Sequence, residues 1–254
     1  MRTTKKRSSA LRRQIFCCLL SAATAALGIS AARGELLFSD SFDYPAGPLA
    51  GQGPPAGAPP GQTGWTLVSG KPEVIPPGLH FPRVFSAGVG AGVMHQQVDN
   101  TVIANLTPVS SGIVWIGFLF EQVGGPGSVF GFAVLNLSAQ DGNPPTGYGV
   151  LFVSDRFGID NDFGGQRVVT DIAPGHRPAW LVVKLNFDTG RQDLFVNPTD
   201  ATATPDASLA MTPTFRASGF SQVWLHEGLN DRGSAFVFDE LRVGRTFADI
   251  RVGE

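Results

Sequence analysis

Residues 181–196 constrain the fold of this chain more than any other stretch of its sequence. Apolar side chains occupy every second position from Leu181 to Phe187, and three of the four positions that follow them are polar. A period of two is typical of a β-strand with one buried face. The turn sequence Asp-Thr-Gly follows at 188–190, and residues 191–196 continue the pattern, so a β-hairpin is predicted.

The rest of the sequence favours the same class of structure. It contains 32 Gly and 19 Pro, and charged residues make up 16% of it, which indicates many turns and little helix. The run 113–120 is continuously apolar and predicts a strand buried on both faces. Residues 154–167 are expected to form an acidic loop or the end of a hairpin. The other short strands are expected at 36–44, 65–68, 74–75, 79–81, 91–98, 129–137, 148–153, 222–226 and 236–243.

These strands predict one all-β domain, a two-sheet antiparallel jelly-roll sandwich of about twelve strands without helix. The Pro/Gly-rich block 46–64 cannot form a helix or a central strand, so we expect a loop there. The segment before it is too short to fold alone, and the predicted domain therefore spans 33–254. No repeat of fixed period is visible.

Residues 1–32 predict a signal peptide. Six basic residues precede an apolar run at 15–29, and the small residues Ser30, Ala31 and Ala32 follow it. The alternative is an uncleaved anchor, but a run of about fifteen residues is short for a membrane span of roughly twenty. We therefore expect cleavage near Ala32 and a secreted protein, either extracellular or periplasmic.

Cleavage would change the chemistry of the chain. Cys17 and Cys18 would leave with the signal, so the mature chain would have no disulfide. The mature part would keep thirteen basic residues against 21 acidic ones, a formal charge of −8. An acidic surface argues against nucleic acid as a partner and fits a cation or an uncharged ligand.

Three stretches of the sequence resemble a known family. The motif Phe-Ser-Asp-Ser-Phe-Asp-Tyr-Pro at 38–45, the hairpin 181–196 and the ending Phe-Asp-Glu-Leu-Arg-Val-Gly at 238–244 are similar to exported concanavalin A-like (LamG-like) lectin/glucanase-fold proteins. The resemblance implies a two-sheet jelly roll that is often a carbohydrate-binding or adhesive module and sometimes an enzyme.

The closing strand carries the first candidate site. In a regular strand Asp239 would share its face with Val237, Leu241 and Val243, whereas Glu240 would lie opposite. A carboxylate among apolar side chains is costly unless it is paired or binds a metal. The first and last strands of lectin-fold sandwiches commonly lie near each other, so Asp40 or Asp43 could join Asp239 around a structural Ca²⁺. The alternative is that Asp239 accepts backbone hydrogen bonds.

The second candidate is a ligand site around a tryptophan. An aromatic face can cover the apolar face of a sugar, and Trp224 would share its sheet face with His226. Core packing is the alternative for each of the four tryptophans. Asp160 and Asp162 with Asp155 are expected in a solvated turn. The predicted ligand-binding residues are Trp224, His226, Glu227, Asn230, Asp231 and Arg232.

An enzyme is the less favoured class. Glycosidases need two carboxylates about 5–5.5 Å apart for retaining chemistry, and no strand carries such a pair of acids on one face. A Gly-x-Ser-x-Gly elbow and a zinc motif are also missing. Asn105 and Asn136 begin glycosylation triplets, which matter only in a host that uses them.

The sequence therefore predicts an exported, non-enzymatic β-sandwich module. Its expected partner is a glycan or a cell-surface polysaccharide, and it could serve at the cell surface or in a matrix. Two alternatives stay open: a polysaccharide-cleaving hydrolase or lyase on the same fold, and a structural envelope protein without a soluble ligand.

Overall fold

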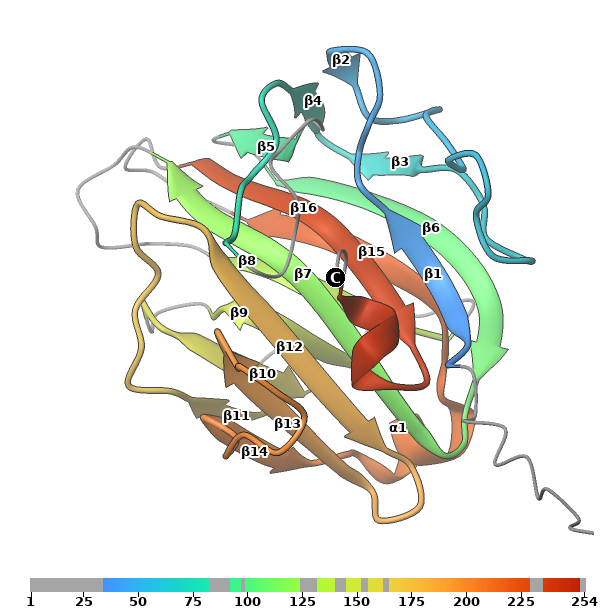
Figure 1. The fold of residues 1–254 in the computed structure, drawn as a ribbon, viewed down its shortest axis with the longest axis vertical. Coiled ribbons are helices and arrows are strands. Elements are labelled where there is room, and N and C mark those ends of the chain that lie inside the picture. Colours follow the sequence, from blue (N-terminus) through green and yellow to red (C-terminus); the bar gives the residue numbers. More distant parts are fainter. Residues whose placement is uncertain are drawn as a thin grey trace, which may run out of the picture. The chain divides into compact units, whose positions relative to one another are not determined.

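The computed structural model describes residues 34–82, 92–96, 99–123, 132–139, 145–151, 155–161, 165–228 and 235–251. Residues 34–254 make up one compact unit. Its described strands form two antiparallel sheets that pack face to face, as predicted (Figure 1). None of the described helices is long and apolar enough to span a bilayer.

The first sheet has nine strands. Its order is β14 (Ala207–Ala210), β13 (Arg191–Val196), β12 (Ala179–Asn186), β7 (Ile113–Val123), β16 (Ala235–Gly244), β5 (Gly92–Gln96), β4 (Glu73–Ile75) and β2 (Gly47–Pro48), and β1 (Leu36–Asp40) also pairs with β16. The predicted hairpin is confirmed as β12 and β13, which pair from Leu181↔Val196 to Asn186↔Arg191.

The second sheet has seven strands. Its order is β11 (Gln166–Val169), β10 (Phe157–Asn161), β9 (Thr146–Val150), β8 (Phe132–Ser138), β15 (Phe220–Gly228), β6 (Asn100–Val109) and β3 (Thr66–Ser69). Its central strand β15 pairs with β6 on one side and with β8 on the other.

Phenylalanine fills much of the space between the sheets. Phe120 on β7 meets Phe238 edge-on at 5.2 Å and Phe236 at 5.5 Å between ring centroids, and it also contacts Phe157 of the other sheet. All four rings are buried. Each fully buried aromatic side chain of this size stabilises the fold by roughly 1.5–3 kcal/mol.

A smaller apolar layer covers the outer face of the nine-stranded sheet. We call it the outer cluster. The 3₁₀ helix η1 (Phe247–Ile250) lies over β7 and β16 in this layer (Figure 1). This second layer explains why β7 is buried on both faces, as its continuous apolar sequence predicts. The outer cluster consists of Leu79, Trp115, Leu119, Trp180, Val182, Phe195, Val237, Phe247 and Ile250.

Several local predictions were wrong. A short helix, α1 (Pro213–Ser218), forms because Thr212 caps its N-terminus and Pro213 occupies its first turn. Strand β14 was not expected from the sequence. Of the two alternatives for residues 154–167, the structure shows the hairpin, which β10 and the start of β11 form. Residues 79–81 are not a strand. The sixteen strands of the described residues exceed the predicted twelve because short edge strands carry little sequence pattern.

The Pro/Gly-rich block 46–64 packs on the sandwich and is not a linker. Thr63 donates its backbone N–H to the carbonyl of Asn105 on β6. The side chain of Gln62 bonds both backbone groups of Ser39, at 3.0 and 2.8 Å. Gln62 therefore acts like one residue of a neighbouring strand and covers the free edge of β1.

A buried polar network joins the two sheets. The Gln192 side chain on β13 is fully buried, and its Oε1 accepts hydrogen bonds from the hydroxyls of Tyr148 and Thr146, at 2.6 and 3.0 Å. Its Nε2 donates to Oδ1 of Asn161 at 2.7 Å. Asn161 in turn donates to the carbonyl of Ala210. One glutamine thus connects strands β9 and β10 of one sheet with β14 of the other.

We predict that Gln192→Leu lowers the free energy of unfolding by about 2–4 kcal/mol, because it leaves the groups of Tyr148, Thr146 and Asn161 buried and unpaired. Urea denaturation of the purified protein measures the change. Gln166→Leu is the matched control, since Gln166 is exposed on β11. Equal effects of the two substitutions would show that the network does not stabilise the fold.

Candidate functional site

Strand β15 sorts its side chains onto the two faces of the seven-stranded sheet. Val223 and Leu225 belong to the main core. Trp224 and His226 alternate with them and therefore lie on the outer face, as the sequence predicts. Gln222 lies on the same outer face, two residues before Trp224.

Amide side chains accompany Trp224 on this face. Gln222 donates from Nε2 to Oδ1 of Asn105, which is directly opposite it on β6, at 3.0 Å. The indole N–H of Trp224 donates to Oε1 of Gln222 at 3.1 Å. Asn136 on β8 is directly opposite Trp224 on its other side. We call Asn105, Gln222, Trp224 and Asn136 the amide–indole row.

The row holds its indole in a defined orientation, because the only polar atom of that ring is bonded to Gln222. Trp224 is half-buried, so part of the ring faces outward. An oriented aromatic ring beside amide groups is a suitable arrangement for sugar rings, which present apolar faces and hydroxyl edges.

His226 lies beside the row and is held by two neighbours. Its Nε2 is 3.2 Å from Oδ1 of Asp99, and the ring of Phe132 meets the imidazole edge-on at 4.7 Å. Burial lowers the pKa of His226, and the neighbouring Asp99 partly offsets this effect. The imidazole is therefore uncharged at neutral pH.

Of the other predicted ligand residues, the structure describes Glu227 alone, and it does not lie on this face. Glu227 points to the opposite side of β15 and is only 1% exposed. Burial raises its pKa to about 9, so the group is neutral at pH 7. Asn230, Asp231 and Arg232 lie outside the described residues.

The remaining tryptophans have structural environments. Trp65 is buried in the main core, stacks on Phe42 at 5.6 Å and donates its indole N–H to Asp40. Trp115 and Trp180 belong to the outer cluster under η1. Core packing thus explains these three, and Trp224 alone among the four is not buried.

A β-bulge corrects the predicted faces of β16. Asp239 is opposite Leu119 of β7, whereas Arg242 is opposite Gly117, so β16 has one extra residue between them. Glu240 lies in this interval with a φ of 50°. Val237 consequently belongs to the outer cluster, but Leu241 and Val243 turn into the main core with Phe236 and Phe238. The prediction that Asp239 shares a face with Leu241 and Val243 was therefore wrong.

Backbone donors surround Asp239, as the alternative predicted. Its Oδ2 accepts the N–H of Leu79 and its Oδ1 the N–H of Glu240, both at 2.7 Å. Burial raises the pKa of Asp239 to about 8 against the effect of these hydrogen bonds, and nearby Glu240 and Asp43 add to the rise. Asp239 thus fastens segment 76–82 to the outer face of the sheet.

Asp40 is likewise occupied by protein donors. Its Oδ1 accepts the N–H of Phe42, and its Oδ2 accepts the hydroxyl of Tyr44 and the indole N–H of Trp65, all within 2.8 Å. Burial raises the pKa of Asp40, although these hydrogen bonds lower it. A cation would need the same oxygens.

These donors do not fit a calcium site built from Asp40, Asp43 and Asp239. Within the described ranges, no group of three or more His, Cys, Asp or Glu side chains is arranged to hold a metal ion. The observed geometry favours structural carboxyls, and calcium stays a prediction.

Of the acidic residues expected in a solvated turn, Asp155 lies in a bend, whereas Asp160 belongs to a strand. Asp160 lies on β10, 3.8 Å from the guanidinium of Arg167 on β11. Asn161 is fully buried in the network around Gln192. Asp162 lies outside the described residues.

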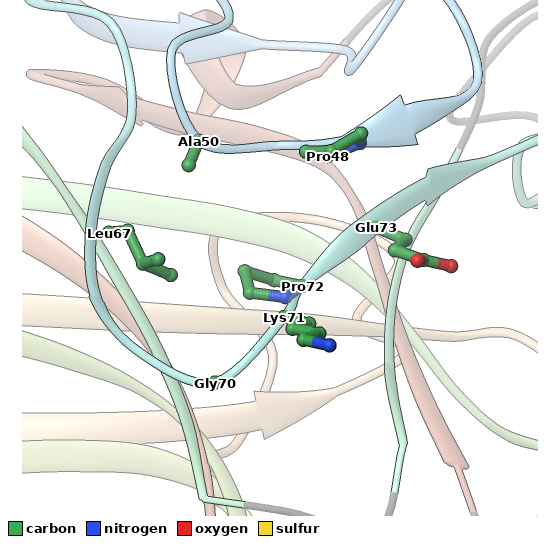
Figure 2. A pocket seen from close by; sticks show the side chains of 7 residues that line it. All are labelled: Pro48, Ala50, Leu67, Gly70, Lys71, Pro72 and Glu73. Carbon is green, nitrogen blue, oxygen red and sulfur yellow. The ribbon is translucent and has the colours of Figure 1, made fainter.

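A hollow of about 290 Å³ lies at the edge where β2, β3 and β4 meet. Figure 2 shows Leu67, Ala50 and Pro72 around it, with the Glu73 carboxylate turned away. Its lining is mainly proline and aliphatic, with Lys71 and Glu73 as its charged residues, and it contains no aromatic ring for a sugar to stack on.

Comparison with known proteins shows the fold and no closer relationship. No family model matches the sequence, and no curated protein matches it. A sialidase structure is 7% identical with a TM-score of 0.50, covering 73% of this chain and 17% of its own. This likeness supports the predicted β-sandwich.

Two further structures are similar at lower TM-scores. Botulinum neurotoxin type C, whose cell entry depends on two ganglioside molecules, has a TM-score of 0.48 and 9% identity over 75% of this chain and 44% of its own. A glycosyl hydrolase family 16 protein from Mycobacterium smegmatis has a TM-score of 0.48 and 14% identity over 82% of this chain and all of its own. This chain thus spans less than half the length of the toxin and sialidase chains. The neighbours include both binding domains and enzymes.

Sequence reasoning missed three members of the amide–indole row. Gln222 could have been predicted, because the period of two that places Trp224 and His226 on one face also places Gln222 there. In the sequence, Asn105 and Asn136 stand out only as the first residues of glycosylation triplets. Their position beside Trp224 depends on the register of β6 and β8 against β15.

We predict that Asp239 makes the protein less stable as pH rises. Its pKa is about 8 in the folded state and about 3.9 in the unfolded chain, so unfolding releases a proton between these values. The stabilisation is fully present below about pH 4 and is lost as pH rises through 8, with a slope of at most about 1.4 kcal/mol per pH unit.

Urea denaturation at pH 5, 7 and 9 measures this dependence. Asp239→Asn should reduce the loss of stability, leaving the part due to the other carboxyls whose pKa burial raises, among them Glu227, Asp40 and Glu240. Asp171→Asn, at an exposed carboxyl, is the control. A wild-type protein that is more stable at pH 9 than at pH 5 would contradict the prediction.

The calcium hypothesis makes a separate prediction. A bound ion stabilises the folded state by mass action, so excess chelator should lower the thermal unfolding midpoint of the wild type. Asp239→Asn should show no such difference. Identical wild-type melting curves in Ca²⁺ and in chelator would rule out the site.

Proposed function

We propose that this chain is an exported, non-enzymatic module that binds glycans through the outer face of its seven-stranded sheet. The observation that carries the proposal is the amide–indole row, in which a hydrogen bond to Gln222 orients a half-buried Trp224 in the free protein. The indole offers a surface for the apolar face of a sugar, and the neighbouring amides offer donors and acceptors to its hydroxyls.

The surrounding groups support binding over catalysis. On the described part of this face, Asp160 is paired with Arg167 and Asp99 with His226. Glu227, the acid next in sequence to His226, points away from the face. General acid–base cleavage needs two carboxyls that flank one glycosidic bond, and the described groups provide no such pair on this face.

Location and role follow from the same proposal. The basic and apolar stretches within residues 1–32 support export, and the net acidic composition of the rest supports a neutral partner over nucleic acid. A protein of this kind would act outside the cytoplasm, on a cell-surface or matrix polysaccharide.

A glycan array with the purified protein tests the proposal. We expect binding to at least one glycan class, and at least tenfold weaker binding for Trp224→Ala, because loss of one aromatic platform costs about 1.4 kcal/mol or more. Ile113→Ala is the control, since Ile113 is an exposed apolar residue (39% exposed) on the other sheet.

A reducing-end release assay on the same glycans separates the alternatives. Binding without release supports the proposed module, and release of reducing ends would replace it by the polysaccharide-cleaving enzyme. Absence of both glycan binding and reducing-end release would favour a structural protein without a soluble ligand.

A further inference from the structure

Asn136 has a buried oxygen that the fold leaves unused. The residue is 3% exposed, and within the described structure its Oδ1 is closed off from water and accepts no hydrogen bond. A buried carbonyl oxygen without a donor destabilises the folded state, since the same oxygen is hydrated in the unfolded chain. Proteins often keep such destabilising groups at functional sites.

The position of this oxygen connects it with the glycan-binding face. Asn136 is directly opposite Trp224 on β15 and directly opposite Gly147 on β9. A Cβ at position 147 would lie 2.6 Å from Oδ1, so glycine is needed there to make room for the amide. The side-chain oxygen of Asn105, by contrast, accepts a hydrogen bond from the amide of Gln222.

We propose that Asn136 is the specificity-determining residue of the face and accepts a hydrogen bond from a hydroxyl of an uncharged glycan. The inference rests on the proposed function and deepens it. The free oxygen can only accept, so it selects a donor such as a sugar hydroxyl and repels the carboxylate of an acidic sugar.

The charges around the row lead to the same ligand class. Arg167 lies within 3.8 Å of Asp160, and His226 within 3.2 Å of Asp99, where burial keeps the imidazole neutral. Arg167 and His226 therefore each already have an acidic neighbour. An acidic sugar would have to displace a carboxylate, whereas a neutral sugar would not.

Access to the oxygen requires a movement, because it is closed off in the free protein. Trp224 is the cross-strand neighbour on the same face, and one hydrogen bond to Gln222 holds its indole. We infer that this ring rotates when a sugar binds, which would expose Oδ1 and place the indole against the sugar. The other three tryptophans are buried, so a change in tryptophan fluorescence on binding would report this ring.

The test uses Asn136→Val and Asn136→Ala, with two oligosaccharide panels, one of uncharged hexoses and one containing uronic or sialic acids. We expect the wild type to prefer the uncharged panel and both variants to bind it at least tenfold more weakly. We also expect an unfolding midpoint for Asn136→Val at or above that of the wild type, because the variant removes an unpaired oxygen.

Asn186→Ala provides a control with the opposite behaviour. Its Oδ1 accepts the N–H of Thr189 in the β12–β13 turn of the other sheet, so the variant should lose stability and keep its binding. A purely structural Asn136 would behave in the same way, with a lower midpoint and unchanged binding, and that result would overturn the inference.

The outcomes separate this inference from the proposed function. If the wild type binds no glycan, the proposed function fails and the inference falls with it. If the wild type binds and Trp224→Ala weakens binding while both Asn136 variants bind normally, the inference alone fails. Preference for the acidic panel would also overturn it.

Discussion

The bulge in β16 is the constraint on which the nine-stranded sheet depends. One edge of this strand pairs with β5 from Ala235 to Phe238, and after the bulge it pairs with β1 from Leu241 to Gly244. The extra residue bends the strand and shifts by one residue the alternation of its side chains between the two faces. Two separate partners can therefore share one strand, and both halves still send apolar side chains into the main core.

The same bulge explains the buried carboxyl of Asp239. The residue lies where the ladder is interrupted, and it accepts the N–H of Glu240, which the irregular backbone leaves available. Its second oxygen holds Leu79 and thereby the segment that covers the sheet. Asp239 thus has a structural role at this bulge. The bulge corrects the regular strand that the sequence suggested, and calcium binding stays a prediction.

The two sheets have different surfaces, and this difference places the candidate site. Helix η1 and segment 76–82 cover the outer face of the nine-stranded sheet with an apolar layer. The outer face of the seven-stranded sheet instead carries the amide–indole row and paired charges. In the described part of the chain, the second face thus combines a half-buried indole with hydrogen-bonded amide side chains, which is the combination that recognition of a sugar requires.

The sequence by itself determined the all-β class, the β12–β13 hairpin, the doubly buried β7 and the common face of Trp224 and His226. Each of these follows from local periodicity, which a strand expresses wherever it lies. The sequence could not show the bulge at Glu240, the short strands β10, β11 and β14, or the meeting of Asn105, Asn136 and Gln222. Those features depend on register between strands that are far apart in the chain, and a shift of one residue sends every side chain to the other face.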